Sequence, residues 1–219
     1  MLGVDQSAGM LARARGLGDL TGVRLSEQIV GGAVEKLTSH PFNSRFAGDS
    51  HDALIHHGDN VRRLELVQAG VSDLTHLEGY DGRDHGCCQS AYQNALGGRV
   101  VVSTYAPWRR LGRISKRSQL LMVVDWLSSG KLPILIEQHV RVAPFIRMSG
   151  DGSKLATVLL NSTLDASGPL EVRLRSTAQR VALITAGGAL PLTVIPGNGE
   201  IRVTVPSIGP WQPAILLGQ

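Results

Sequence analysis

The stretch GGRVVVSTYAPWRRLGRISKRSQLLMVVDWLSSGKLP, from Gly97 to Pro133, contains the clearest strand and the clearest helix of the sequence. Residues Arg99 to Thr104 form a short β-branched run without alternation, which is typical of a strand covered on both faces. From Ser115 onward, apolar residues recur at helical spacing until Gly130 and Pro133 end the pattern. A buried strand, a loop and an amphipathic helix make half of a βαβ unit. We therefore predict an α/β fold with a parallel sheet for this part of the chain.

The character of the sequence changes after Pro133. Short β-prone runs follow one another there without helical spacing, and Gly, Pro, Asn and Asp separate them. The runs are Ile134 to Ile146, Leu155 to Asn161, Leu170 to Leu174, Val181 to Ile184, Leu192 to Ile195 and Ile201 to Val205. This spacing predicts a small antiparallel β-sandwich. We expect two domains, an α/β domain over residues 1–132 and a β-sandwich domain over residues 133–219.

Composition restricts the class of protein. The chain has 219 residues, of which 42% are hydrophobic but only 4% aromatic, so a substantial core must be built from aliphatic side chains. A net charge of +4 is too small to indicate an anionic partner by itself. The only cysteines, Cys87 and Cys88, are adjacent, and we interpret them as thiols in a reducing compartment. With no membrane-spanning run in the sequence, we expect a cytoplasmic protein.

Four phrases resemble bacterial glycoside-hydrolase-type proteins related to the β-galactosidases that carry a glutamine-amidotransferase-like domain behind a catalytic barrel. They are DQSAGMLARARGLGDLTGV at Asp5 to Val23, YQNALGGRVVVSTYAPW at Tyr92 to Trp108, KRSQLLMVVDWL at Lys116 to Leu127 and VLLNSTLDASGPLEVRLR at Val158 to Arg175. Together they extend over nearly the whole chain.

The resemblance implies an amidotransferase-like parallel-sheet domain followed by a terminal β-domain. In such proteins a (β/α)₈ barrel of about 250 residues comes first and supplies two catalytic carboxylates. Nothing in this sequence can serve as that barrel, so no catalytic residue is carried over. The implied role is an accessory or oligomerisation portion, with a homo-oligomer or a missing N-terminal catalytic barrel as partner. Amidotransferase chemistry is not expected, because Cys87 and Cys88 lack the glycine and the helix of a nucleophile elbow.

The most suggestive chemical cluster lies in HDALIHHGD and contains His51, Asp52, His56, His57 and Asp59. Imidazoles and carboxylates at such short spacing can share a divalent metal, here through His51, His56, His57 and Asp59. A bound metal lowers the pKa of its water and makes it a nucleophile at neutral pH. The alternative function is therefore a stand-alone hydrolase of a small ester or lactone substrate. A solvated, histidine-rich loop explains the same residues without any chemistry.

Two further clusters could each be a binding or reactive site, but each also has a simpler structural explanation. Asp81, Asp84 and His85 precede the two cysteines, which suggests a soft-metal site or a reactive thiolate, or simply a turn before a buried strand. The only concentrated basic run contains Arg109, Arg110, Arg113, Lys116 and Arg117. Phosphate-rich partners would suit this run, with Trp108 beside it to stack a base or a sugar. We interpret it as solvated charge at a subunit contact and do not expect nucleic-acid binding.

Overall fold

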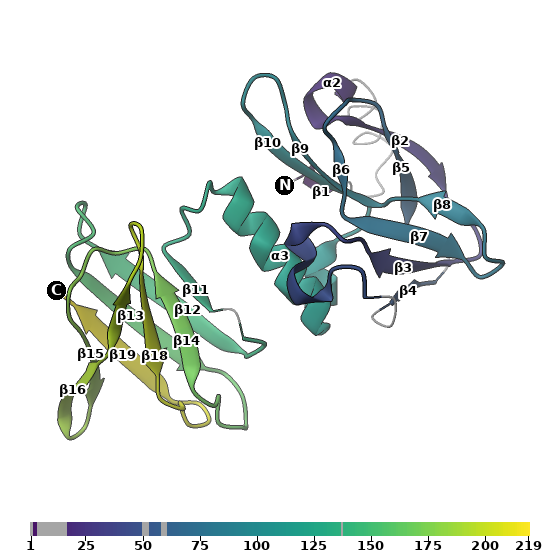
Figure 1. Cartoon of the computed structure of the whole chain (residues 1–219). Helices are drawn as coiled ribbons and strands as arrows, with labels where there is room; N and C mark the ends of the chain where they lie inside the picture. The colour runs from purple at the N-terminus through teal and green to yellow at the C-terminus, as the bar shows by residue number, and fades with distance from the viewer. Residues whose placement is uncertain (1, 4–16, 50–52, 58–60, 137) are drawn as a thin grey trace. The chain divides into compact units, whose positions relative to one another are not determined.

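The computed structural model describes residues 2–3, 17–49, 53–57, 61–136 and 138–219 (Figure 1). It divides into two compact units, Met1–Gly130 (unit 1) and Lys131–Gln219 (unit 2). No helix in these described ranges combines the length and the apolar character needed to cross a lipid bilayer.

Unit 1 contains three small sheets with short helical segments beside them (Figure 1). One sheet has the order β1 (Leu2–Gly3), β10 (Arg99–Ser103), β9 (Gln89–Gln93) and β6 (Ser72–Asp73). Another has the order β4 (Leu54–His56), β3 (Ala33–Leu37), β7 (Thr75–Gly79) and β8 (Asp84–Gly86). The third pairs β2 (Val23–Gln28) with β5 (Arg62–Leu66). The helical segments are α2 (Gly18–Thr21), η1 (Pro41–Phe46), η2 (Pro107–Arg110) and α3 (Ile114–Leu127).

The predicted parallel-sheet, amidotransferase-like fold is wrong for this unit. Strand β10 pairs antiparallel with β9, and the two are joined by the turn at Gly97. Among the described strands, the one parallel pairing is that of β10 with β1, which is two residues long. Burial of β10 on both faces was predicted, and its inner residues confirm it, because Val101 and Val102 belong to different apolar clusters. A strand between two layers is buried on both faces whether its sheet is parallel or antiparallel, so burial does not establish strand direction.

Helix α3 forms where predicted, but its buried face differs from the predicted apolar stripe. Its buried residues are Ser115, Lys116, Gln119 and Val123, of which only the last is apolar. Val123 packs with Leu74, Ala91 and Val101 over the β9–β10 sheet. The other three carry polar groups into the unit, where Lys116 and Gln119 join a buried network of hydrogen bonds.

Unit 2 consists of two antiparallel sheets, in agreement with the predicted β-sandwich. The first has the order β11 (Ile134–Ile136), β14 (Leu170–Leu174), β18 (Ile201–Val205) and β17 (Val194–Pro196). The second has the order β12 (Val142–Met148), β13 (Leu155–Asn161), β19 (Pro213–Gly218), β15 (Val181–Thr185) and β16 (Gly188–Leu192). One apolar cluster joins them, with Leu174 and Val203 from the first sheet and Leu159 and Leu216 from the second. The runs predicted from sequence did not include β19, which is the central strand of the second sheet.

Candidate functional site

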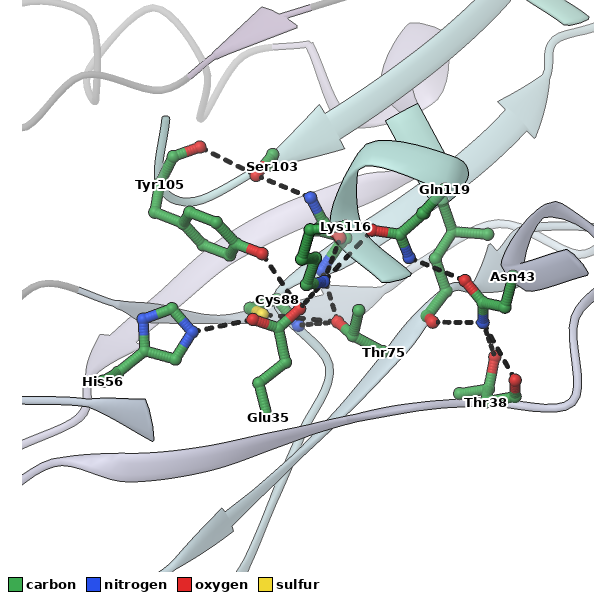
Figure 2. Close-up of polar contacts among 12 residues, drawn as sticks. Glu35, Thr38, Asn43, His56, Thr75, Cys88, Ser103, Tyr105, Lys116 and Gln119 are labelled. Carbon is green, nitrogen blue, oxygen red and sulfur yellow. Dashed lines mark hydrogen bonds and ion pairs between the residues drawn. The ribbon is translucent and has the colours of Figure 1, made fainter. Parts of the chain in front are cut away.

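A buried ion pair between Glu35 and Lys116 forms the centre of a network of polar contacts in unit 1 (Figure 2). Glu35 comes from β3 and is 1% exposed, while Lys116 comes from the first turn of α3 and is 3% exposed. The distance from Lys116 Nζ to Glu35 Oε1 is 2.5 Å. Charges of this kind are almost never buried unless they are paired, because each loses its hydration. The pair therefore connects α3 to a strand 81 residues earlier in the chain.

The ammonium group of Lys116 has a partner for each of its three hydrogens. Besides Glu35, it donates to Gln89 Oε1 at 3.2 Å and to Gln119 Oε1 at 3.1 Å. Because both amide oxygens face the ammonium, both amide nitrogens point away and donate onward. Gln89 Nε2 donates to Ser103 Oγ at 3.2 Å, and Gln119 Nε2 donates to Asn43 Oδ1 at 2.7 Å.

Asn43 links this network to the backbone. It lies in η1, whose first turn contains Pro41 and is capped by His40 Nδ1 accepting from the Phe42 amide at 3.2 Å. Its own Nδ2 donates to the carbonyls of Thr38 and Leu74, each at 2.9 Å. The network thus holds η1, β3, β9 and α3 in one fixed arrangement.

The carboxylate of Glu35 also accepts from an imidazole and a phenol (Figure 2). His56 Nε2 lies 2.7 Å from Glu35 Oε2, and the Tyr105 hydroxyl donates to Oε1 at 3.1 Å. The other imidazole nitrogen, Nδ1, is buried without a partner among the described residues. Because the Glu35 carboxylate can only accept, His56 Nε2 carries a hydrogen and donates it to Oε2.

Opposing effects determine the ionisation of Glu35. Burial alone raises the pKa of its carboxyl group, but the charge of Lys116 and the hydrogen bond and charge of His56 together outweigh burial. The resulting pKa is about 2, below the ordinary value of 4.5. Burial raises the pKa of the Tyr105 phenol well above its usual range, so this hydroxyl remains a donor. The centre is therefore a permanent carboxylate surrounded by donors.

Cys88 lies beside this carboxylate. Ligand atoms of Glu35, His56 and Cys88 all lie within 4.8 Å of one another, and a carboxylate, an imidazole and a thiol are a donor set suited to zinc. Zinc binds the thiolate form of cysteine. Burial raises the pKa of the Cys88 thiol well above its usual range, and its Sγ lies 3.3 Å from Thr75 Oγ1. The ammonium group of Lys116 already contacts the Glu35 carboxylate, so this lysine supplies the positive charge that a zinc ion would otherwise bring.

The structure places only part of the site predicted in HDALIHHGD. Residues 51, 52 and 59, which are His51, Asp52 and Asp59, lie outside the described residues. His56 ends β4 with its side chain buried, whereas the next residue, His57, is exposed. Successive side chains on an extended strand point to opposite sides, so these two imidazoles do not converge. The metal site that combines them with His51 and Asp59, and the catalytic site that also includes Asp52, stay predictions.

The other predicted clusters are also divided by the structure. Asp81 and Asp84 are exposed in the β7–β8 hairpin, where each caps a nearby backbone amide. Cys87 and Cys88 are buried free thiols, and burial raises the pKa of Cys87 to about 12. The predicted reactive thiolate is therefore not supported. In the basic run, Lys116 is buried whereas Arg109 and Arg113 are exposed, so the run is not one solvated patch.

Sequence reasoning missed Glu35, Tyr105, Gln89 and Gln119 as members of the site. The available signal was a lysine and a glutamine three residues apart on one helix face, next to the apolar residues of the same helix. Lys116 and Gln119 share that face by the helical repeat. No local pattern identifies the strand glutamate that they meet.

This arrangement is suited to structural stabilisation rather than to acid–base catalysis. A general acid or base works best when its pKa lies near the operating pH, and catalytic glutamates are usually tuned upward. The pKa of Glu35 is moved the other way, to about 2. Its carboxylate is closed to solvent and already holds three donors, which leaves little room for a reacting group.

Comparison with known proteins gives a structural likeness only. No family model matches the chain, and no curated protein matches it. Among solved structures, α-L-fucosidase isoenzyme 2 from Paenibacillus thiaminolyticus matches with a TM-score of 0.63 and 13% identity, over 91% of this chain and 34% of that one. A β-galactosidase from Bacillus circulans sp. alkalophilus matches with a TM-score of 0.50 and 13% identity, over 93% of this chain and 25% of that one. The chain thus spans about a third and a quarter of these two glycoside hydrolases.

Proposed function

We propose that this chain is a non-catalytic accessory portion of a glycoside-hydrolase-like protein. The observation that carries the proposal is the extent of the structural likeness, which covers 91% of this chain but only 34% of the fucosidase. A likeness at 13% identity supports a shared fold, and the activity of the fucosidase is not transferred by it.

The chemistry of unit 1 supports the same proposal. The cluster of ionisable groups around Glu35 is closed to solvent, and Lys116 neutralises the buried Glu35 carboxylate. A glycosidase of the usual kind needs two carboxyl groups beside a sugar-binding cleft, one of them with a raised pKa. Glu35 does not fit this description. Its carboxylate is buried against Lys116, and its pKa is lowered rather than raised. We infer that this centre holds α3 on the sheets and performs no reaction.

The experiment is a turnover assay of the purified chain with chromogenic fucosides, galactosides, esters and lactones, each with and without a chelator. The Glu35→Gln and His57→Ala variants are assayed in parallel. We expect no turnover above the buffer rate for any of the three proteins, and no effect of the chelator. Hydrolysis by the wild-type chain that is lost on chelation or in His57→Ala would overturn the proposal. It would favour instead the predicted ester or lactone hydrolase with its metal-assisted site around residues 51–59.

A further inference from the structure

The outward side of the second sheet of unit 2 is apolar. Because directly paired residues on antiparallel strands point to the same side, the ladder pairings define a row across all five strands. The row runs through Phe145, Val158, Ile215, Ile184 and Ala189. None of its members belongs to the buried core, and Phe145 is 61% exposed and Ile215 39% exposed.

A second row lies beside the first on the same side of the sheet. It runs through Arg147, Ala156, Leu217, Ala182 and Pro191, and Leu217 is 46% exposed. A shorter third row on the same side contains Ala143, Leu160 and Pro213, and we call the three rows together the outer face. Arg147 is the only charged residue in them, and it lies on β12, at the edge of the sheet. On the three inner strands the neighbours of these residues, such as Leu159 and Leu216, form the buried core, so both sides of the sheet are apolar there.

The other sheet of the same unit provides an internal comparison. On β18 the sequence IRVTV alternates, with Arg202 and Thr204 exposed and Ile201, Val203 and Val205 buried. The outward residue Glu171 on β14 accepts from Thr204 Oγ1 at 2.7 Å. An antiparallel sheet with one solvent-exposed side normally shows this alternation of buried apolar and exposed polar residues. The chain therefore follows the solvent-facing pattern on one sheet and departs from it on the other.

The size of the outer face suits a two-fold contact between copies. Five strands spaced about 4.8 Å apart, with about 20 Å of length each, present roughly 450–500 Å². The largest apolar patch on a typical monomer is of about this size, and such a patch is often functional. Two such faces bury about 1,000 Å² in total, which is the lower limit for a specific protein interface.

The edges of the sheet argue against strand addition as the mode of contact. The edge strands β12 and β16 contain Pro144 and Pro191, and proline on an edge strand disfavours pairing with another chain. Contact through the face requires no charged partner, because Arg147 alone carries charge and can remain hydrated at the rim. Sheet-on-sheet packing is also the contact that already forms the core of this unit.

We propose that the outer face binds the outer face of a second copy of this chain. This inference rests on the proposed accessory function and names its partner. It is tested by the oligomeric state of the chain rather than by enzymatic turnover. A failure of either proposal is therefore distinguishable from a failure of the other. Because a two-fold contact contains each residue twice, one substitution acts at two positions of the interface.

The experiment is sedimentation velocity of the full chain from about 1 to 100 µM, a range suited to the micromolar affinity of a small interface. We expect a dimer that dissociates on dilution and persists in about 0.5 M NaCl, because screening weakens charge contacts but not apolar ones. Leu217→Lys should remain monomeric throughout, with dissociation at least about 100-fold easier, since it buries two unpaired charges. Thr204→Lys, on the outward side of the other sheet and facing Glu171, is the matched control and should dimerise normally.

Phe145→Lys provides a second variant in case Leu217→Lys fails to fold, because Phe145 lies on an edge strand and is largely exposed. It should also be monomeric, with the circular dichroism of the wild type. A wild-type chain that stays monomeric at about 100 µM would overturn the proposal. Dimerisation that survives both lysine substitutions, or that Thr204→Lys abolishes equally, would overturn it as well.

Discussion

Removal of the positive charge at the centre of unit 1 should destabilise that unit strongly. Lys116→Met keeps the length of the side chain but leaves the Glu35 carboxylate buried without a cation. Breaking a buried pair by removing one partner typically costs about 3–5 kcal/mol. The adjacent strand residue Lys36 provides a control, since it pairs with Glu78 at 2.7 Å on the partly exposed surface. Lys36→Met should cost far less than Lys116→Met, because an ion pair on the surface contributes little to stability.

The pKa of Glu35 gives an independent value for the same effect. It falls from 4.5 to about 2 on folding, and at 1.36 kcal/mol per pKa unit this corresponds to roughly 3 kcal/mol at neutral pH. Because the pKa is lower in the folded state, this stability is fully present above pH 4.5 and is lost as the pH falls toward 2. Between pH 7 and pH 3 the folded chain should lose about 2 kcal/mol from this group.

The assay is urea unfolding at a series of pH values, followed by hydrogen exchange of peptides from β3 and β13 so that each unit is observed separately. The Glu35→Gln Lys116→Met double variant completes a thermodynamic cycle, because it removes both charges and keeps an acceptor for His56. Its loss of stability should be smaller than the sum of the two single losses by at least about 1 kcal/mol. Additive losses, or a wild type and double variant with the same pH dependence, would refute the reasoning.

Two further predictions concern the surroundings of this centre. Gly31 and Gly32 both have positive φ, and a Cβ on Gly32 would lie 2.6 Å from the His56 carbonyl oxygen whereas one on Gly31 would meet nothing. Chemical denaturation should therefore show a loss of about 1 kcal/mol for Gly31→Ala and a clearly larger loss for Gly32→Ala, and equal losses would contradict this. Since burial raises the pKa of Cys87 to about 12 and that of Cys88 well above its usual range, neither thiol should react with iodoacetamide at pH 8 until the chain is unfolded. Rapid labelling of the native chain, measured by mass spectrometry, would show that these thiols are accessible.

Part of the fold was predictable because it depends on local sequence. The helix from Ile114 to Leu127 follows from its spacing and from Gly130, and the alternation in IRVTV indicates a strand with one wet side. The direction of β10 was not predictable from its composition, because RVVVS suits any strand between two layers. Its antiparallel partner was nevertheless adjacent in sequence, across the Gly97 turn.

The site was less predictable than the fold. Glu35 and Lys116 are 81 residues apart, and each is an ordinary charged residue in its local sequence. Lys116 lies within a run of arginines, which suggested a solvated patch, and only the packing of α3 places its ammonium inside the unit. His56 and His57 appear equivalent in the sequence, but His56 is buried at the end of β4 whereas His57, directly after the strand, is exposed.

The most direct test is the titration of the Glu35 side chain by NMR, with its carboxyl carbon labelled and assigned by comparison with Glu35→Gln. A structural carboxylate held by Lys116 should titrate with a pKa of about 2 and shift upward when Lys116→Met is introduced. A pKa at or above the ordinary value of 4.5 would contradict the account, because it would indicate a carboxyl group open to solvent or tuned for proton transfer.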